Sequence, residues 1–175
     1  MTSSMVFTFI GADKPGLVER LAQTVSQHGG NWLESRMSQL AGQFAGIVQV
    51  DVTASKRQAL REALLDLTVS GLTIVVADDA LAADTGNFRQ LRLSIIGNDR
   101  PGIVREVASA LSQHQINVRE MDTTITSAPM TGEPLFEALA EIEVPRSFDL
   151  AELNQQLDAI ADSLTVDIAL EESLR

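Results

Sequence analysis

The chain has 175 residues, of which 45% are hydrophobic and 21% are charged, so it can bury a core and is not a disordered segment. It has no cysteine, which excludes disulfides and thiolate metal sites, and its net charge of -11 opposes direct contact with nucleic-acid phosphates. No basic leader precedes the first apolar residues, and no apolar run approaches the roughly 20 residues that span a bilayer, so we expect a cytoplasmic protein without a membrane partner.

The first half of the chain predicts the order strand, helix, strand, strand, helix, strand. Apolar residues three or four apart predict the helices, and clean alternation predicts the third of these strands. Glycines follow both helices, and residues 41–43 predict a hairpin turn. The predicted ranges are 6–10 (strand), 17–28 (helix), 31–40 (strand, weak pattern), 44–52 (strand), 56–70 (helix) and 72–77 (strand).

The second half repeats this order after a polar stretch that begins at Asp78. We therefore predict a first domain over 1–80, a linker over 81–88 and a second domain over 89–175. The predicted ranges in the second half are 89–96 (strand), 101–114 (helix), 116–125 (strand), 135–144 (strand), 150–164 (helix) and 165–170 (strand).

Internal identities show that the chain is a duplication. A shift of 86 residues pairs identical residues, including Gly11/Gly97, Asp13/Asp99, Pro15/Pro101, Gly16/Gly102, His28/His114 and Asn31/Asn117. After the middle of each copy the shift becomes 92, as in Phe44/Phe136, Val52/Val144 and Leu72/Leu164, so the second copy has six extra residues between its middle strands. The βαββαβ order predicts two ferredoxin-like α+β domains, each an antiparallel sheet with both helices on one face.

The turn between the first strand and the first helix of each copy is a candidate anion site. The proline has its φ preset for the first turn of a helix, and the glycine after it lets another molecule approach the main chain. The free N–H groups and the positive end of the helix then suit a carboxylate. Asp13 and Asp99, just before the proline turn, either cap the helix or hold the ammonium group of a zwitterion.

Asn31 and Asn117 open the next strand of each copy. They are either turn residues or amide ligands, and we expect the aspartate, the asparagine and the free N–H groups to converge on a small zwitterion. His28 and His114 are expected to cap helix C-termini rather than to catalyse, because no nucleophile or metal-ligand cluster accompanies them.

Three other features are expected to be structural. Trp32 is expected in a core or an interface, and Met121 and Met130 are expected to fill gaps. The loop that contains the six extra residues, 127–134, is expected to be a variable surface loop or an interaction surface.

Two βαββαβ copies, each with an Asp-(Lys/Arg)-Pro-Gly turn and an asparagine on the next strand, resemble tandem ACT domains. The stretch Ala-Pro-Met-Thr-Gly-Glu-Pro-Leu-Phe over 128–136, with 31–37, further resembles the glycine cleavage system transcriptional repressor group. The resemblance implies amino-acid-sensing units that pair side by side, with ligand between the first turn of one unit and the second-strand start of its neighbour. It assigns ligand binding to Gly11, Asp13, Gly16, Asn31, Gly97, Asp99, Gly102 and Asn117.

The resemblance implies a homodimeric regulator without a cofactor or a metal. A small amino acid, glycine first, would alter its contact with a DNA-binding transcriptional activator protein, so that it represses glycine cleavage genes indirectly. Many members of the family have asparagine where Asp13 and Asp99 stand. The alternatives are an enzyme or its detached regulatory half, and a pure dimerisation module. No catalytic constellation is visible in the sequence, which favours a protein that is not an enzyme.

Overall fold

The computed structural model describes residues 2–77 and 86–172. The chain divides into two compact units, Met1–Ala83 (unit 1) and Asp84–Arg175 (unit 2). Residues 81–85 of the predicted linker lie outside the described residues, so the boundaries of the linker and of the two domains stay predictions. Within the described ranges, no helix combines the length and the apolar character needed to cross a membrane.

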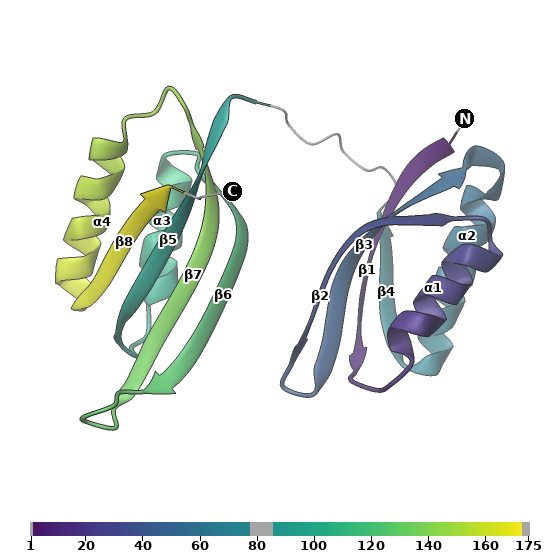
Figure 1. The fold of residues 1–175 in the computed structure, drawn as a ribbon, viewed down its shortest axis with the longest axis horizontal. Helices are drawn as coiled ribbons and strands as arrows, with labels where there is room; N and C mark the ends of the chain where they lie inside the picture. Colours follow the sequence, from purple (N-terminus) through teal and green to yellow (C-terminus); the bar gives the residue numbers. More distant parts are fainter. Residues whose placement is uncertain (1, 78–85, 173–175) are drawn as a thin grey trace. The chain divides into compact units, whose positions relative to one another are not determined.

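Unit 1 is a four-stranded antiparallel sheet in the order β2-β3-β1-β4, with both α-helices on one face (Figure 1). β1 and β3 are longer than the sequence pattern predicts, because residues such as Ser3 and Gln43 continue the pairing beyond the apolar run, whereas β2 and β4 have the predicted ranges. The elements are β1 (Thr2–Ala12), α1 (Leu17–Gln27), β2 (Asn31–Leu40), β3 (Gln43–Thr53), α2 (Ala54–Asp66), the 3-10 helix η1 (Leu67–Ser70) and β4 (Leu72–Ala77).

Unit 2 repeats the arrangement with the strand order β6-β7-β5-β8, again antiparallel and again with both helices on one face (Figure 1). This confirms the prediction of two ferredoxin-like α+β domains. The elements are β5 (Phe88–Asn98), α3 (Ile103–Gln113), β6 (Asn117–Ser127), β7 (Pro134–Pro145), α4 (Leu150–Leu164) and β8 (Val166–Glu172).

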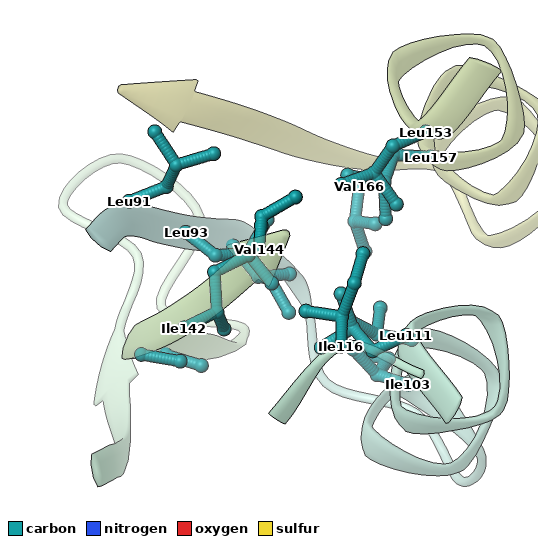
Figure 2. Packing of buried hydrophobic residues seen from close by; sticks show 14 of the residues in the cluster. Leu91, Leu93, Ile103, Leu111, Ile116, Ile142, Val144, Leu153, Leu157 and Val166 are labelled. Carbon is teal, nitrogen blue, oxygen red and sulfur yellow. The ribbon is translucent and has the colours of Figure 1, made fainter. Parts of the chain in front are cut away.

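Each unit has its own core between the sheet and the helices. In unit 1, alternate residues of the central strands, such as Phe7 and Val50, meet Leu21 of α1 and Leu60 of α2. Figure 2 shows the equivalent packing in unit 2, where residues of β5 and β7 face residues of α3 and α4. The two clusters have no residue in common, so each unit holds its own sheet and helices together.

The two hairpins differ in length. In unit 1, Ala41 (φ 50°) and Gly42 (φ 78°) form the tight turn that the sequence predicts. In unit 2 the extra residues form a longer tip, closed by hydrogen bonds from Ala128 N to the Glu133 oxygen and from Gly132 N to the Ala128 oxygen, both 2.9 Å. Met130 at this tip is 97% exposed, so the expectation that it fills a gap is wrong.

Two other expectations have different outcomes. Met121 packs against the core of unit 2, as expected for a gap-filling residue. The pairing of Leu72 with Leu164 is wrong, because Leu72 lies opposite Gly11 whereas Val166 lies opposite Gly97. The structural counterpart of Leu72 is therefore Val166, and the identity with Leu164 is coincidental.

Candidate functional site: the turns before α1 and α3

The turn that the sequence singles out lies between β1 and α1, and its repeat lies between β5 and α3. The residue that precedes each helix is a glycine in the left-handed region, Gly16 at φ 88° and Gly102 at φ 104°. An L side chain is strained there, which explains the residue type. A Cβ at Gly16 would meet no atom within 4 Å, so the space above the turn in unit 1 is open.

Backbone hydrogen bonds fix the position of each turn. The N–H of Asp13 donates to the Gly42 oxygen and that of Asp99 to the Pro134 oxygen, each at 2.9 Å. The turn is thereby attached to the neighbouring hairpin in both units. These two amides are occupied and are not available to a ligand.

The amides of the first helical turn are available. The first three N–H groups of an α-helix have no acceptor within the helix, and here they have none elsewhere among the described residues. They belong to Leu17, Val18 and Glu19 in unit 1 and to Ile103, Val104 and Arg105 in unit 2. Together with the positive end of the helix they form a surface that suits a carboxylate.

The side chains of Asp13 and Asp99 are exposed and make no hydrogen bond or ion pair with any residue in the described ranges. The helix-capping interpretation is therefore wrong, because a cap requires a bond to an N–H group of the first turn. Each carboxylate remains accessible at the turn that precedes the free amides. A negative group and a set of N–H donors at one turn match the two ends of a zwitterion.

The asparagines do not lie at these turns. Asn31 lies opposite Asp51, which lies opposite Ser4, whereas the turn follows Ala12 at the other end of β1. Eight residues of strand place the two ends of the sheet roughly 25 Å apart. Asn117 is placed in the same way. It lies opposite Glu143, which lies opposite Gln90 of β5, whereas the turn follows Asn98 at the other end of β5.

The expected convergence of aspartate, asparagine and amides within one unit is therefore wrong. The physical reason is that the first helix carries the chain back along the sheet before the second strand begins. An asparagine can reach such a turn only from another unit.

Gly11 and Gly97 have a packing reason to be glycine. A Cβ at Gly11 would lie 2.7 Å from Cδ2 of Leu72, and one at Gly97 would lie 2.8 Å from Cα of Val166. These distances are shorter than van der Waals contact. The glycines let the outer strand approach the central strand next to the turn.

The cation after each aspartate distinguishes the two turns. Arg100 donates from Nη1 to the carbonyl oxygen of Leu164, 2.8 Å away, at the C-terminal end of α4. Lys14, its counterpart, has no such partner in the described part of the chain. The sequence shows the Lys/Arg difference but not its consequence, because the acceptor in unit 2 lies 64 residues away along the chain.

Both histidines lie at helix ends, as expected. His28 follows α1, and its Nδ1 lies 2.9 Å from the Thr24 oxygen. His114 follows α3, with Nε2 2.6 Å from Oε1 of Gln156 and its ring 4.9 Å from that of Phe148. Within the described residues, no group of three or more His, Asp or Glu side chains is placed to hold a metal ion.

Comparison with known families identifies both units. A family model described as the ACT domain matches residues 3–76, and a second model of the same description matches residues 91–162. The curated relatives match a stretch of this chain about as long as one domain. The UPF0237 protein of Methanosarcina mazei is 32% identical over 79 residues, which are 45% of this chain and 80% of that protein.

Among solved structures, an unknown protein from Galdieria sulphuraria has a TM-score of 0.88 at 28% identity, covering 99% of this chain and 100% of that one. A protein described as a candidate glycine cleavage system transcriptional repressor has a TM-score of 0.74 at 18% identity, covering 100% and 99%. At that identity the second similarity shows the fold alone.

Proposed function

The chain belongs to the ACT-domain family, with one domain in each unit, and on that premise we propose that it is an amino-acid-responsive regulatory protein and not an enzyme. The observation that carries the proposal is the repeated turn. In both units, one turn carries free amides of a helix N-terminus and an exposed aspartate, which complement the carboxylate and the ammonium group of an α-amino acid.

We further propose how the asparagines take part. β2 and β6 are edge strands of their sheets, and each starts at the end remote from its own turn. If the β2 edge of one unit pairs antiparallel with the corresponding edge of another ACT unit, the asparagine of one comes to the turn of the other. The separation of each asparagine from the turn of its own unit therefore suits a site that two units share.

The proposed ligand is a small amino acid, with glycine as the first candidate, and the proposed partner is a DNA-binding transcriptional activator. The net charge of -11 supports action through a protein rather than on DNA directly. The fold shared over the full length with a candidate glycine cleavage repressor supports the same role. The proposal is a homodimeric, indirect repressor in the cytoplasm.

A thermal-shift and calorimetric screen with the common amino acids tests the sensing role. We expect glycine or another small amino acid to raise the melting temperature, because a ligand at about 100 times its Kd adds about 2.7 kcal/mol to the stability. Asn31→Ala with Asn117→Ala should abolish the shift, whereas Asn154→Ala, at an exposed position of α4, should leave it unchanged. Absence of heat and of any shift with every amino acid would leave only a dimerisation module.

Replacing Asp13 and Asp99 by asparagine tests the orientation of the ligand. If the ammonium group lies on the aspartate, the loss of a charge-assisted hydrogen bond should weaken binding about fivefold. Tighter binding by the Asp13→Asn, Asp99→Asn variant would show that the ligand carboxylate lies there instead.

A further inference from the structure

The sheet face of unit 2 that points away from its helices carries an excess of negative charge. Every second residue of β5 and β7 is buried under the helices, so the residues between them lie on the open face. The acidic residues of this open face are Glu120, Asp122, Glu137, Glu141, Glu143, Asp167 and Glu171. The basic residues described there are Arg92 and Arg119.

Unit 1 shows that the fold does not require five of these carboxylates. The strand registers give the counterpart of each open-face residue in the duplicated sheet. The counterparts are Arg36 for Asp122, Ala45 for Glu137, Gln49 for Glu141, Thr73 for Asp167 and Ala77 for Glu171. The same sheet therefore forms with neutral or basic residues at these five positions, whereas Glu120 and Glu143 have the acidic counterparts Glu34 and Asp51.

Interactions within unit 2 offset only part of this negative charge. Arg119 pairs with Glu143 at 3.0 Å, and Arg92 lies opposite Glu141. Glu120 also has an interaction within the described residues. Seven carboxylates and two arginines nevertheless leave an acidic excess on the open face, which suits contact with a basic surface.

Two exposed apolar side chains lie among the carboxylates on the central strands of this face. Ile96 is 43% exposed and Leu139 is 45% exposed, and both line an open hollow together with Asp122, Thr124 and Glu137. Exposed apolar side chains beside charged ones can contribute to a protein interface. Four strands at about 4.8 Å and about nine residues at 3.3 Å give on the order of 550 Å², which suits a reversible contact rather than a permanent one.

We propose that this open face of unit 2 docks the basic surface of a nucleic-acid-binding protein, with Ile96 and Leu139 in the contact and the carboxylates meeting lysine and arginine side chains. Charge complementarity selects the occupant. A second copy of this chain does not complement the face, because the chain carries a net charge of -11. The proposal rests on the proposed action through a protein partner, and it does not depend on amino-acid binding.

Binding of a fluorescein-labelled oligo-arginine peptide to the full chain tests the proposal by fluorescence anisotropy. The face variant Glu137→Gln, Glu141→Gln, Asp167→Asn should raise the Kd about tenfold, as expected for three charge contacts of about 0.5 kcal/mol each. The matched control Glu152→Gln, Asp158→Asn, Asp162→Asn removes the same charge from exposed positions of α4 and should change the Kd less than about twofold. Circular dichroism verifies that both variants fold.

An equal loss in the two variants would mean that the peptide senses only net charge, and no loss in the face variant would mean that it binds elsewhere. Competition by calcium chloride well beyond that of sodium chloride at equal ionic strength would assign the face to a metal ion. Each of these results overturns the proposal. The amino-acid thermal shift, measured on the same variants, should be unchanged, so a failure of sensing and a failure of docking are distinguished.

Discussion

Unit 1 and unit 2 have the same topology and the same registers between their first, second and third strands, yet they differ on the sheet face that the helices leave open. That face is mostly neutral in unit 1, with Ile47 and Val75 exposed, and acidic in unit 2 around Leu139. The helix side is constrained in both units by close packing. Because packing against the helices does not constrain the open face, the residue types there can differ between the two units. The acidic excess of unit 2 therefore supports the docking role proposed for its open face.

The two candidate ligand turns differ as well. Arg100 is bonded to the end of α4, whereas Lys14 makes no such bond. The ammonium group of Lys14 is available to a ligand carboxylate in unit 1, and the guanidinium of Arg100 instead attaches its turn to the helix. The two turns are therefore similar in backbone but not equivalent in the charge that they offer.

The largest expected effect comes from core substitutions that separate the two units. Leu21→Ala should destabilise unit 1 by about 3 kcal/mol, because it leaves a cavity in a fully buried site. Leu111→Ala should do the same to unit 2. Trp32 contacts Phe7 in the core of unit 1, so urea unfolding followed by tryptophan fluorescence reports that unit.

We expect Leu21→Ala to lower the urea midpoint of the fluorescence transition and Leu111→Ala to leave it unchanged. Circular dichroism, which detects both units, should show a shift for each variant. A fluorescence midpoint that moves equally in both variants would show that the two units unfold as one.

A smaller effect is expected from the glycines that precede the turns. Gly97→Ala brings Cβ to 2.8 Å from the backbone Cα of Val166, whereas Gly11→Ala mainly meets the end of the Leu72 side chain at 2.7 Å. A side chain can move more easily than a strand. We expect a loss of about 2 to 3 kcal/mol for Gly97→Ala and about 1 kcal/mol less for Gly11→Ala, measured by urea unfolding. The opposite order would contradict the close approach of β8 to β5.

An effect of about 1 kcal/mol is expected where the second helix of each unit ends. Thr165 follows α4 at φ 56°, and the counterpart in unit 1 is Gly71 at φ 89°. A β-branched residue is unfavourable in the left-handed region, so Thr165→Gly should raise the stability of unit 2 by about 1 kcal/mol. Thr165→Ala serves as the control, because alanine retains the Cβ. Equal effects of the two substitutions would show that the backbone strain is absent.

The smallest expected effect separates the two cations. Arg100→Gln should cost unit 2 about 0.5 to 1 kcal/mol through the lost bond to the Leu164 oxygen, whereas Lys14→Gln should change stability by less than about 0.5 kcal/mol. Calorimetry with the amino acid that binds should show the opposite order for affinity. Lys14→Gln should lower the affinity a few-fold, and Arg100→Gln should leave it unchanged. Equal losses of affinity in the two variants would make the turns equivalent.

The fold follows from the sequence because two independent signals agree. The repeat gives the domain plan, and the alternation of residues such as Val48 and Val50 gives the buried face. The weak pattern over β2 has a physical cause. An extra residue, Leu33, bulges out of the pairing, so Trp32 and Met37 both pack on the core although simple alternation would place them on opposite faces.

The candidate site was predicted only in part. The left-handed glycines at Gly16 and Gly102 are local features, and the Asp-(Lys/Arg)-Pro-Gly pattern is enough to locate them. The distance from Asn31 to its own turn depends on the direction in which α1 carries the chain, which no residue pattern near the turn encodes. The bond of Arg100 depends on a carbonyl in a distant helix, so it was visible only in the structure.

The longer hairpin of unit 2 is a suitable place for a label or an insertion. Its additional residues end before Pro134, whose carbonyl oxygen holds the amide of Asp99. The tip around Met130 and Gly132 can therefore be cut by a protease, lengthened or given a dye while that attachment is retained. A fluorophore at Met130 would be exposed to water and would report on partners without altering the backbone of the turn after β5.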